Sequence, residues 1–181
     1  MTPDPALREA LLAAVPSLRA FAISLSGQVD RADDLVQDTL LRALSNLHRF
    51  ERGTNLNAWL FTILRNLFHS EYRKRRREVE DPEGTYAGRL KVQPEQNAHL
   101  DFEDFRSALA KLPSDQREAL LLVGASGFSY EEAAHICGCA VGTIKSRVNR
   151  ARFRLASLLN VDDMDDLGPD SMTRAALQGI G

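Results

Sequence analysis

The stretch Ser129 to Leu155 decides how the second half of the chain folds; it reads S-Y-E-E-A-A-H-I-C-G-C-A-V-G-T-I-K-S-R-V-N-R-A-R-F-R-L. Ser129 followed by Glu132 has the spacing of a capping box, which predicts that a helix begins here. The small Ala133-Ala134 pair lets a second helix cross closely, and a turn containing Gly138 separates the two helices. This order predicts a helix-turn-helix, whose second helix fits a DNA major groove.

The second helix of this stretch is expected to begin near Val141 or Thr143, with an apolar inner face and a basic outer face. Its outward side chains include Lys145, Ser146 and Asn149. Lysine donates to guanine acceptors and asparagine pairs with adenine, so these positions are candidate base contacts. Candidate phosphate contacts, which position the helix without reading sequence, are Arg147, Arg150 and Arg154. The alternative is an ordinary helical hairpin with a solvated basic face.

The composition of the whole chain points away from nucleic acid. The 181 residues carry a formal net charge of −2 and a pI of about 6.1, with 44% hydrophobic and 27% charged residues, as in a globular protein. The charges are sorted along the chain, however. Residues 73–77 and 145–154 form two basic blocks, and aspartates gather in residues 162–170. Two local cationic surfaces bind phosphates even when the total charge is near zero.

The rest of the chain shows helical periodicity and no convincing strand, which predicts an all-α fold. Pro16 interrupts the first helical stretch, so a second helix is expected to begin there and to end at Gly27. The next helix opens near Asp30 and has a broad apolar stripe: Leu35, Val36, Thr39, Leu40, Ala43, Leu44 and Leu47. After a loop over residues 48–57, a long helix has its apolar face from Trp59 to Tyr72 and runs into the first basic block.

The periodicity collapses between Glu80 and Gln96, where prolines and glycines interrupt it. Such a stretch is longer than an ordinary loop and predicts a flexible linker between two small domains. The expected organisation is a helical domain over residues 1–79, a linker over 80–97, a domain of four short helices over 98–160 and an acidic tail over 161–181. Part of the tail, from Met172 to Ile180, fits a short docking helix.

Three motifs resemble those of bacterial sigma factors. The stretch D-D-L-V-Q-D-T-L-L-R-A, Asp33 to Ala43, and the stretch N-A-W-L-F-T-I-L-R-N-L-F, Asn57 to Phe68, resemble sigma region two. P-S-D-Q-R-E-A-L-L-L, S-Y-E-E-A-A and V-G-T-I-K-S-R-V-N-R-A-R resemble region four. The large central region of housekeeping sigma factors is absent, so the resemblance is to the extracytoplasmic-function (ECF) class. The run T-I-L-R-N-L-F-H-S-E-Y-R-K-R-R-R-E-V-E-D is similar to its general-stress-response branch.

The resemblance implies a contact with core RNA polymerase. In the family, the polar face of the second region-two helix docks on the polymerase clamp, and the matching residues here are Asp34, Gln37 and Asp38. Their spacing keeps them outside while Leu35 and Val36 go inside. Without the family, a plain solvated acidic face is the simpler interpretation.

The resemblance also implies opening of the minus-ten promoter element by flipping one base into a pocket, at a cost that stacking and hydrogen bonds repay. Phe50 matches the loop aromatic of that pocket, and the matching helix residues are Ile63, Asn66 and Ser70. The cations that would hold the melted strand are Arg65, Arg73, Arg76 and Arg77. Phe50 fits equally well as an aromatic that covers the core, the arginine run as a solvated segment, and Trp59 as a core residue.

In region four of the family, the second helix of the helix-turn-helix reads the minus-thirty-five element. Lys145, Ser146 and Asn149 fall on the matching positions. No cofactor is expected. His135, Cys137 and Cys139 form an H-x-C-x-C cluster, but no fourth ligand stands out, and the two cysteines are too few and too close to staple a domain of this size. Neither a secretory signal nor a membrane span is visible, so a cytoplasmic protein is expected.

Three functions remain open on these observations. The first is a sigma factor, not an enzyme, whose partners are core RNA polymerase, promoter DNA and an anti-sigma factor, with no membrane insertion and no small-molecule substrate. The second is a sigma-like decoy that sequesters an anti-sigma factor without binding DNA; it predicts a receiver domain and a reading helix without basic residues. The third is a conventional helix-turn-helix repressor, which predicts a dimerisation or ligand domain. No phosphate loop, paired catalytic carboxylates or Ser-His-Asp arrangement suggests an enzyme.

Overall fold

A computed structural model describes residues 4–78 and 100–160 of the chain. Within these ranges the chain forms seven α-helices, one short 3-10 helix and one short π-helix, without a strand, which confirms the all-α prediction. The chain divides into two compact units, Met1–Ala87 and Gly88–Gly181. The expected linker and the acidic tail, with its candidate docking helix, lie outside the described residues. The exact domain limits at residues 79 and 98 therefore stay a prediction.

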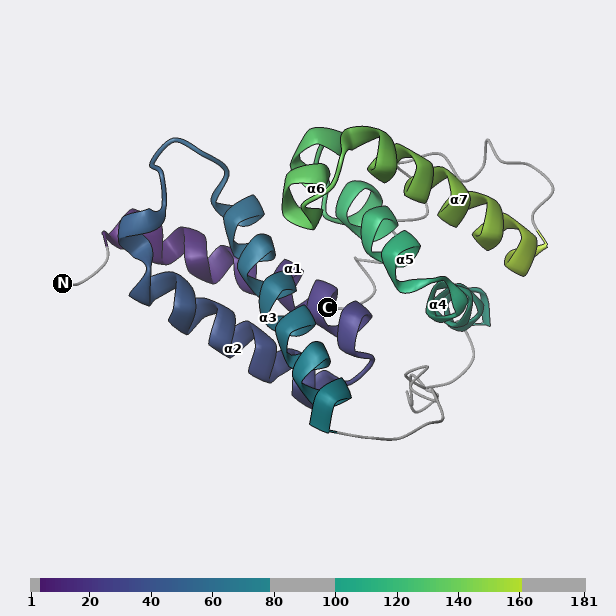
Figure 1. The fold of residues 1–181 in the computed structure, drawn as a ribbon, viewed down its shortest axis with the longest axis horizontal. Helices are drawn as coiled ribbons and strands as arrows, with labels where there is room; N and C mark the ends of the chain where they lie inside the picture. The colour runs from purple at the N-terminus through teal and green to yellow at the C-terminus, as the bar shows by residue number, and fades with distance from the viewer. Residues whose placement is uncertain (1–3, 79–99, 161–181) are drawn as a thin grey trace. The chain divides into compact units, whose positions relative to one another are not determined.

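The first unit is a bundle of three helices: α1 (Pro5–Ser26), α2 (Val29–Ser45) and α3 (Leu56–Glu78), shown in purple to teal in Figure 1. A 3-10 helix, η1 (Leu47–Arg49), leads into the loop before α3. Each helix packs against the other two. The ring centroids of Phe21 and Phe61 lie 5.0 Å apart in the core. The largest completely buried aliphatic side chains around them are Leu18, Leu35, Leu60 and Leu64.

Helix α1 continues through Pro16, so the expectation of two helices here is wrong. Pro16 is exposed, whereas Ala14 and Leu18 on the opposite side of the helix are buried in the bundle. Burial of that inner face outweighs the hydrogen bond that proline cannot donate. The predicted end of the helix is confirmed: Gly27 adopts φ 70° and its N–H bonds to the carbonyl of Ile23.

By length and composition, α1 is also the one described helix that is apolar enough to cross a membrane, with a mean hydropathy of 1.3 over its best window. The core helix of a globular protein meets the same criterion. Leu11, Leu18 and Phe21 of α1 are buried in the bundle. The criterion is therefore weak support for a membrane span.

The apolar stripe predicted for α2 is confirmed at Leu35, Val36, Thr39 and Ala43, which are buried. Thr39 satisfies its buried hydroxyl by donating to the carbonyl of Leu35 at 2.6 Å. Leu44 is an error of the prediction, since 43% of it is exposed. At about 100° per residue, Leu44 lies about 100° away from Ala43 around the helix, which takes it past the edge of the stripe.

The second unit contains α4 (Leu100–Lys111), α5 (Ser114–Leu120), α6 (Tyr130–Cys137) and α7 (Val141–Leu159). A π-helical segment, η2 (Leu121–Ala125), continues directly from α5. Four helices were expected here and four are found, but α7 is 19 residues long and not short. Its inner face, with Ile144 and Val148 fully buried, packs on α4, α5 and α6 and forms the core of the unit with Leu122 and Ile136.

Candidate functional site

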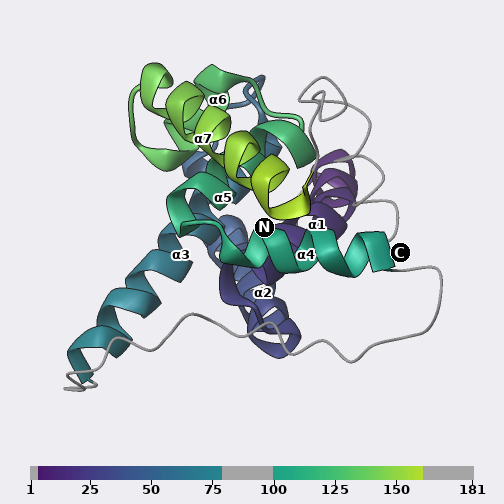
Figure 2. The same ribbon diagram turned by 90° about the vertical axis from the view of Figure 1, so that its right-hand side faces the viewer.

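Helices α6 and α7 form the predicted helix-turn-helix; Figures 1 and 2 show them as neighbours joined by a short turn. The capping box that begins α6 is complete: the Ser129 hydroxyl accepts from the Glu132 N–H at 3.1 Å, and the Glu132 carboxylate accepts from the Ser129 N–H at 2.9 Å. Ala133 and Ala134 are buried, which allows close packing of the two helices. Gly138 ends α6 at φ 65°, a conformation that glycine adopts without strain.

The outer face of α7 presents the predicted reading residues. Lys145 and Asn149 are exposed, Ser146 is half-buried, and Arg150 and Arg154 are exposed. No acidic residue lies on α7. The exposed side of this helix therefore carries cations along its length, with the exposed Phe153 among them, and has hydrogen-bonding groups in its N-terminal half that suit base edges. Which bases or phosphates they contact stays a prediction.

Lys145 has a neighbour on α6 that the sequence did not suggest. Its Nζ lies 5.7 Å from the centre of the Tyr130 ring, at the first residue of α6. A cation over an aromatic face at an exposed site gains about 0.5–1 kcal/mol. The ring therefore biases where the lysine head lies without burying it.

Arg147, a predicted phosphate contact, makes contacts within the protein. Its Nε lies 3.4 Å from a carboxylate oxygen of Asp115 in the first turn of α5, and its Nη1 lies 3.9 Å from the Cys139 sulfur in the turn. Only 25% of the Arg147 side chain is exposed. The structure thus places Arg147 as a link between α7, the turn and α5, apart from the exposed cations of the outer face.

The pocket predicted for a flipped base begins where the loop meets α3. Phe50, which follows η1, lies with its ring centroid 5.2 Å from that of Trp59 near the start of α3. Both aromatic residues are half-buried. Phe50 thus covers Trp59 and keeps an accessible surface, and its role in a base pocket stays a prediction.

Five of the predicted minus-ten residues share one face of α3, because they follow one another at steps of three and four residues: Ile63, Asn66, Ser70, Arg73 and Arg77. Ile63 is half-buried and the other four are exposed. Trp59 lies one turn before Ile63 on the same face. Arg65 and Arg76 were predicted with this group, but at about 100° per residue they lie about a third of a turn around the helix from it.

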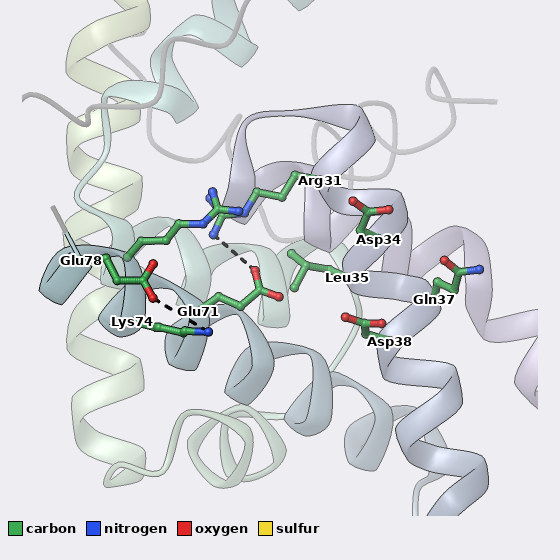
Figure 3. Close-up of a pocket in the computed structure, with 9 residues that line it drawn as sticks. Arg31, Asp34, Leu35, Gln37, Asp38, Glu71, Lys74 and Glu78 are labelled. Carbon is green, nitrogen blue, oxygen red and sulfur yellow. Dashed lines mark ion pairs between the residues drawn. The ribbon is translucent and has the colours of Figure 1, made fainter.

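An open groove runs along α2 and α3 and contains all three predicted polymerase contacts. Figure 3 shows the side chains that line it. Those from α2 are Arg31, Asp34, Leu35, Gln37 and Asp38, and those from α3 are Glu71, Lys74, Arg75 and Glu78. Asp34, Gln37 and Asp38 are exposed, as expected. The sequence interpretation missed the α3 side, although the spacing of residues 71, 74, 75 and 78 marks one helix face.

Arg31 lines this groove, and only 18% of its side chain is exposed. Its Nη2 is 3.6 Å from the Glu71 carboxylate, and its guanidinium carbon is 5.3 Å from the centre of the Phe68 ring. Burial, together with the positive charge of Arg75, lowers the pKa of Arg31 from its usual value, and Glu71 partly offsets this. Arg31 therefore links α2 to α3.

Family models match both units. Residues 11–78 match Sigma-70 region 2, and residues 102–155 match Sigma-70 region 4. The chain is 73% identical over 175 residues to the ECF RNA polymerase sigma factor EcfG of Rhodopseudomonas palustris strain TIE-1, and the match covers 97% of each chain. The chain belongs to the ECF family of RNA polymerase sigma factors.

Solved structures resemble this sigma factor as well. The sigma factor RpoE in complex with the anti-sigma factor NepR, from Bartonella quintana, has a TM-score of 0.79 and 57% identity, covering 88% of this chain and 100% of that one. The anti-anti-sigma factor PhyR in complex with NepR, from the same organism, has a TM-score of 0.54 and 19% identity, covering 83% of this chain and 49% of that one. This second likeness shows a shared fold alone.

The family membership favours the first of the three functions considered from the sequence. This sigma factor binds core RNA polymerase and promoter DNA and directs promoter-specific initiation. Sigma factors are initiation factors and not enzymes. The resemblance stated from the sequence motifs is thereby confirmed, and the identity to EcfG agrees with the general-stress-response branch.

The H-x-C-x-C cluster of this sigma factor does not converge on one point. His135 is exposed on α6, Cys137 is buried, and Cys139 is half-buried beside Arg147. Both cysteines are free thiols. Among the described residues no group of three possible ligands is placed to hold a metal ion.

Proposed function

We propose that each unit of this sigma factor serves a separate promoter element while α2 docks on core RNA polymerase. The predicted domain over residues 1–79, in the first unit, engages the minus-ten element, and the predicted domain over residues 98–160, in the second unit, engages the minus-thirty-five element. The observation that carries the proposal is the outer face of α7, where Lys145 and Asn149 are exposed on an acid-free helix. A decoy that binds no DNA has no need of such a face.

For the minus-thirty-five element, Lys145, Ser146 and Asn149 contact base edges, and Arg150 and Arg154 hold phosphates. The predicted phosphate contact of Arg147 is the weakest of this group, because Asp115 already engages its guanidinium. Asn149 supplies a donor and an acceptor, and Lys145 supplies a donor, near the N-terminal end of the helix that enters the groove. Each base contact of this kind favours the correct base over a wrong one by about 1–3 kcal/mol.

For the minus-ten element, the α3 face with Ile63, Asn66 and Ser70 receives an unpaired base, next to the aromatic pair of Phe50 and Trp59. Arg73 and Arg77 continue this face and hold the phosphates of the melted strand. Arg65 and Arg76 reach the strand only where it curves around the helix, because they lie off the shared face. Stacking and edge hydrogen bonds repay the cost of extruding the base.

On the polymerase side, Asp34, Gln37 and Asp38 contact the clamp with their exposed polar groups. Polymerase performs the chemistry, so the chain itself is not an enzyme, and the complex works in the cytoplasm. An anti-sigma factor holds the protein inactive until a stress signal arrives; the likeness to RpoE bound to NepR supports this partner.

Run-off transcription with purified core polymerase tests the function. We expect initiation above core alone on promoters that carry both elements. In the Lys145→Ala, Asn149→Ala double variant, discrimination between intact and altered minus-thirty-five elements should fall at least about tenfold, since two base contacts of about 1–3 kcal/mol are lost. Affinity for core polymerase should stay unchanged.

Lys111→Ala is the matched control, because Lys111 is an exposed lysine of the same unit on α4. The Lys111→Ala variant should distinguish intact from altered minus-thirty-five elements as well as the parent protein does. If the double variant still distinguishes the intact from the altered minus-thirty-five element as well as the parent protein does, α7 does not read this element. Absence of initiation above core alone would refute the function as a whole.

A further inference from the structure

Five consecutive cations, Arg73 to Arg77, form one block in the sequence but not in the structure. They lie on the last turns of α3, where successive residues point in different directions. Arg73 and Arg77 extend the face of Asn66 and Ser70. Arg75 lies on another side, in line with Glu71 and Glu78, and Lys74 lies at the boundary, four residues after Ser70 and four before Glu78. The block is therefore divided between two surfaces.

Lys74 and Arg75 line the groove that also contains the acidic residues of α2. Figure 3 shows Asp34 and Asp38 on the α2 side and Glu71, Lys74 and Glu78 on the α3 side. Four carboxylates and three cations meet here. The face of Arg73 and Arg77 has no acidic residue among the positions that share it on α3. The two surfaces thus differ in charge as well as in direction.

The charge pattern of the groove does not suit nucleic acid. A phosphate backbone is bound by basic side chains, and the carboxylates of Asp34 and Asp38 beside these cations would repel it. Lys74 does form an ion pair with Glu78, at 3.9 Å, but 78% of the lysine side chain is exposed. An exposed pair of this kind adds little to stability, so the lysine is free to contact a partner.

We propose that Lys74 and Arg75 contact core RNA polymerase and not promoter DNA, so that the docking surface spans α2 and α3. It fits a protein surface on which basic groups face Asp34 and Asp38 and acidic groups face Lys74 and Arg75. Complementary charges of both signs attract the two proteins to each other and also fix the register in which they bind. This inference rests on the proposed docking of α2 on polymerase.

The test compares two charge reversals in the full-length chain. The groove variant is Lys74→Glu with Arg75→Glu, and the matched control is Arg73→Glu with Arg77→Glu. All four side chains are exposed at the same end of α3, and both variants change the charge equally. Circular dichroism and thermal melting establish that each variant is folded. If the reversal unfolds the unit, Lys74→Gln with Arg75→Gln and Arg73→Gln with Arg77→Gln replace the pairs.

Two measurements distinguish the role of the groove from the role of the face that contains Arg73 and Arg77. Affinity for core polymerase is measured by fluorescence anisotropy with labelled sigma factor, and binding of a single-stranded minus-ten oligonucleotide is measured with polymerase at saturating concentration. We expect the groove variant to lose at least tenfold in affinity for polymerase while strand binding at saturation is unchanged. The control variant should keep its polymerase affinity and lose at least tenfold in strand binding.

Asp34→Lys with Asp38→Lys distinguishes failure of this inference from failure of the proposed docking. If this variant loses polymerase affinity and the groove variant does not, the inference is overturned while α2 docking stands. If neither variant loses affinity, both are overturned. If the groove variant loses strand binding in place of polymerase affinity, Lys74 and Arg75 belong to the DNA surface and the inference is again overturned.

Discussion

At the scale of the single residue, Arg147 and Arg150 show how similar positions on one helix acquire different roles. Both are arginines on α7, and the sequence alone assigns both to phosphates. In the structure Arg150 is exposed, whereas Arg147 lies beside Asp115 and Cys139. The partner of Arg147 is distant in the sequence and becomes visible only when α5 packs on α7.

This difference predicts different salt dependence of duplex binding. Arg150→Ala should reduce the slope of log affinity against log salt by about 0.9, the value of one phosphate contact. Arg147→Ala should leave the slope unchanged and lower the melting temperature of the protein, because a link between helices is lost. Titrations of holoenzyme with a minus-thirty-five duplex at several salt concentrations measure the slope. Equal reductions in the two variants would mean that Arg147 does bind phosphate.

Other residue-level predictions succeeded for a simple reason. The exposure of Lys145 and Asn149, and of Asp34, Gln37 and Asp38, follows from helical periodicity alone. Periodicity also places Arg65 and Arg76 off the face of Asn66, but the sequence motif grouped all these arginines together. The groove residues Glu71 and Arg75 could not be assigned before the structure, because their role depends on which face of α3 packs against α2.

At the scale of the element, α1 shows packing overriding local preference. A proline inside a helix costs about 3 kcal/mol relative to alanine, which is why the sequence predicts a break at Pro16. The helix is nevertheless continuous from Pro5 to Ser26 because its inner face is buried along much of this length. The helix ends were easier to predict, since Gly27, the Ser129 cap and Gly138 act through local geometry.

Replacing this proline should therefore stabilise the first unit. Pro16→Ala restores a backbone donor at an exposed position, and we expect the free energy of unfolding to rise by about 1–3 kcal/mol. Pro5→Ala is the control and should have little effect, since Pro5 is at the first helical position, where a proline is tolerated. Urea unfolding followed by circular dichroism gives both values. A loss of stability in Pro16→Ala would show that the bundle depends on the local shape that the proline imposes.

At the scale of the whole molecule, the chain consists of two units that each bury their own core. The two-domain, all-α organisation was predictable because the apolar periodicity stops and resumes. The sequence does not encode in any local pattern how the two units are arranged on a promoter. That arrangement depends on polymerase, to which both units are delivered as one chain.

The covalent linkage of the two units should contribute more to run-off transcription than the affinity of either unit alone for its promoter element. A linked second site experiences an effective concentration in the millimolar range for a short linker. Residues 1–87 and 88–181, expressed as separate chains and mixed at micromolar concentration, should each retain a helical spectrum and a melting transition. Together they should support at least about tenfold less run-off transcript than the intact chain. Equal transcript from the mixture would show that the covalent connection is dispensable.

Segregation of charge on α3 and α7 has a consequence for the life of the free protein. The net charge of the chain is −2, so its long-range attraction to the genome is weak. We therefore expect unassembled molecules to bind bulk chromosomal DNA weakly and to remain available for recruitment by polymerase. On this expectation, the search for promoters begins after the sigma factor has joined polymerase.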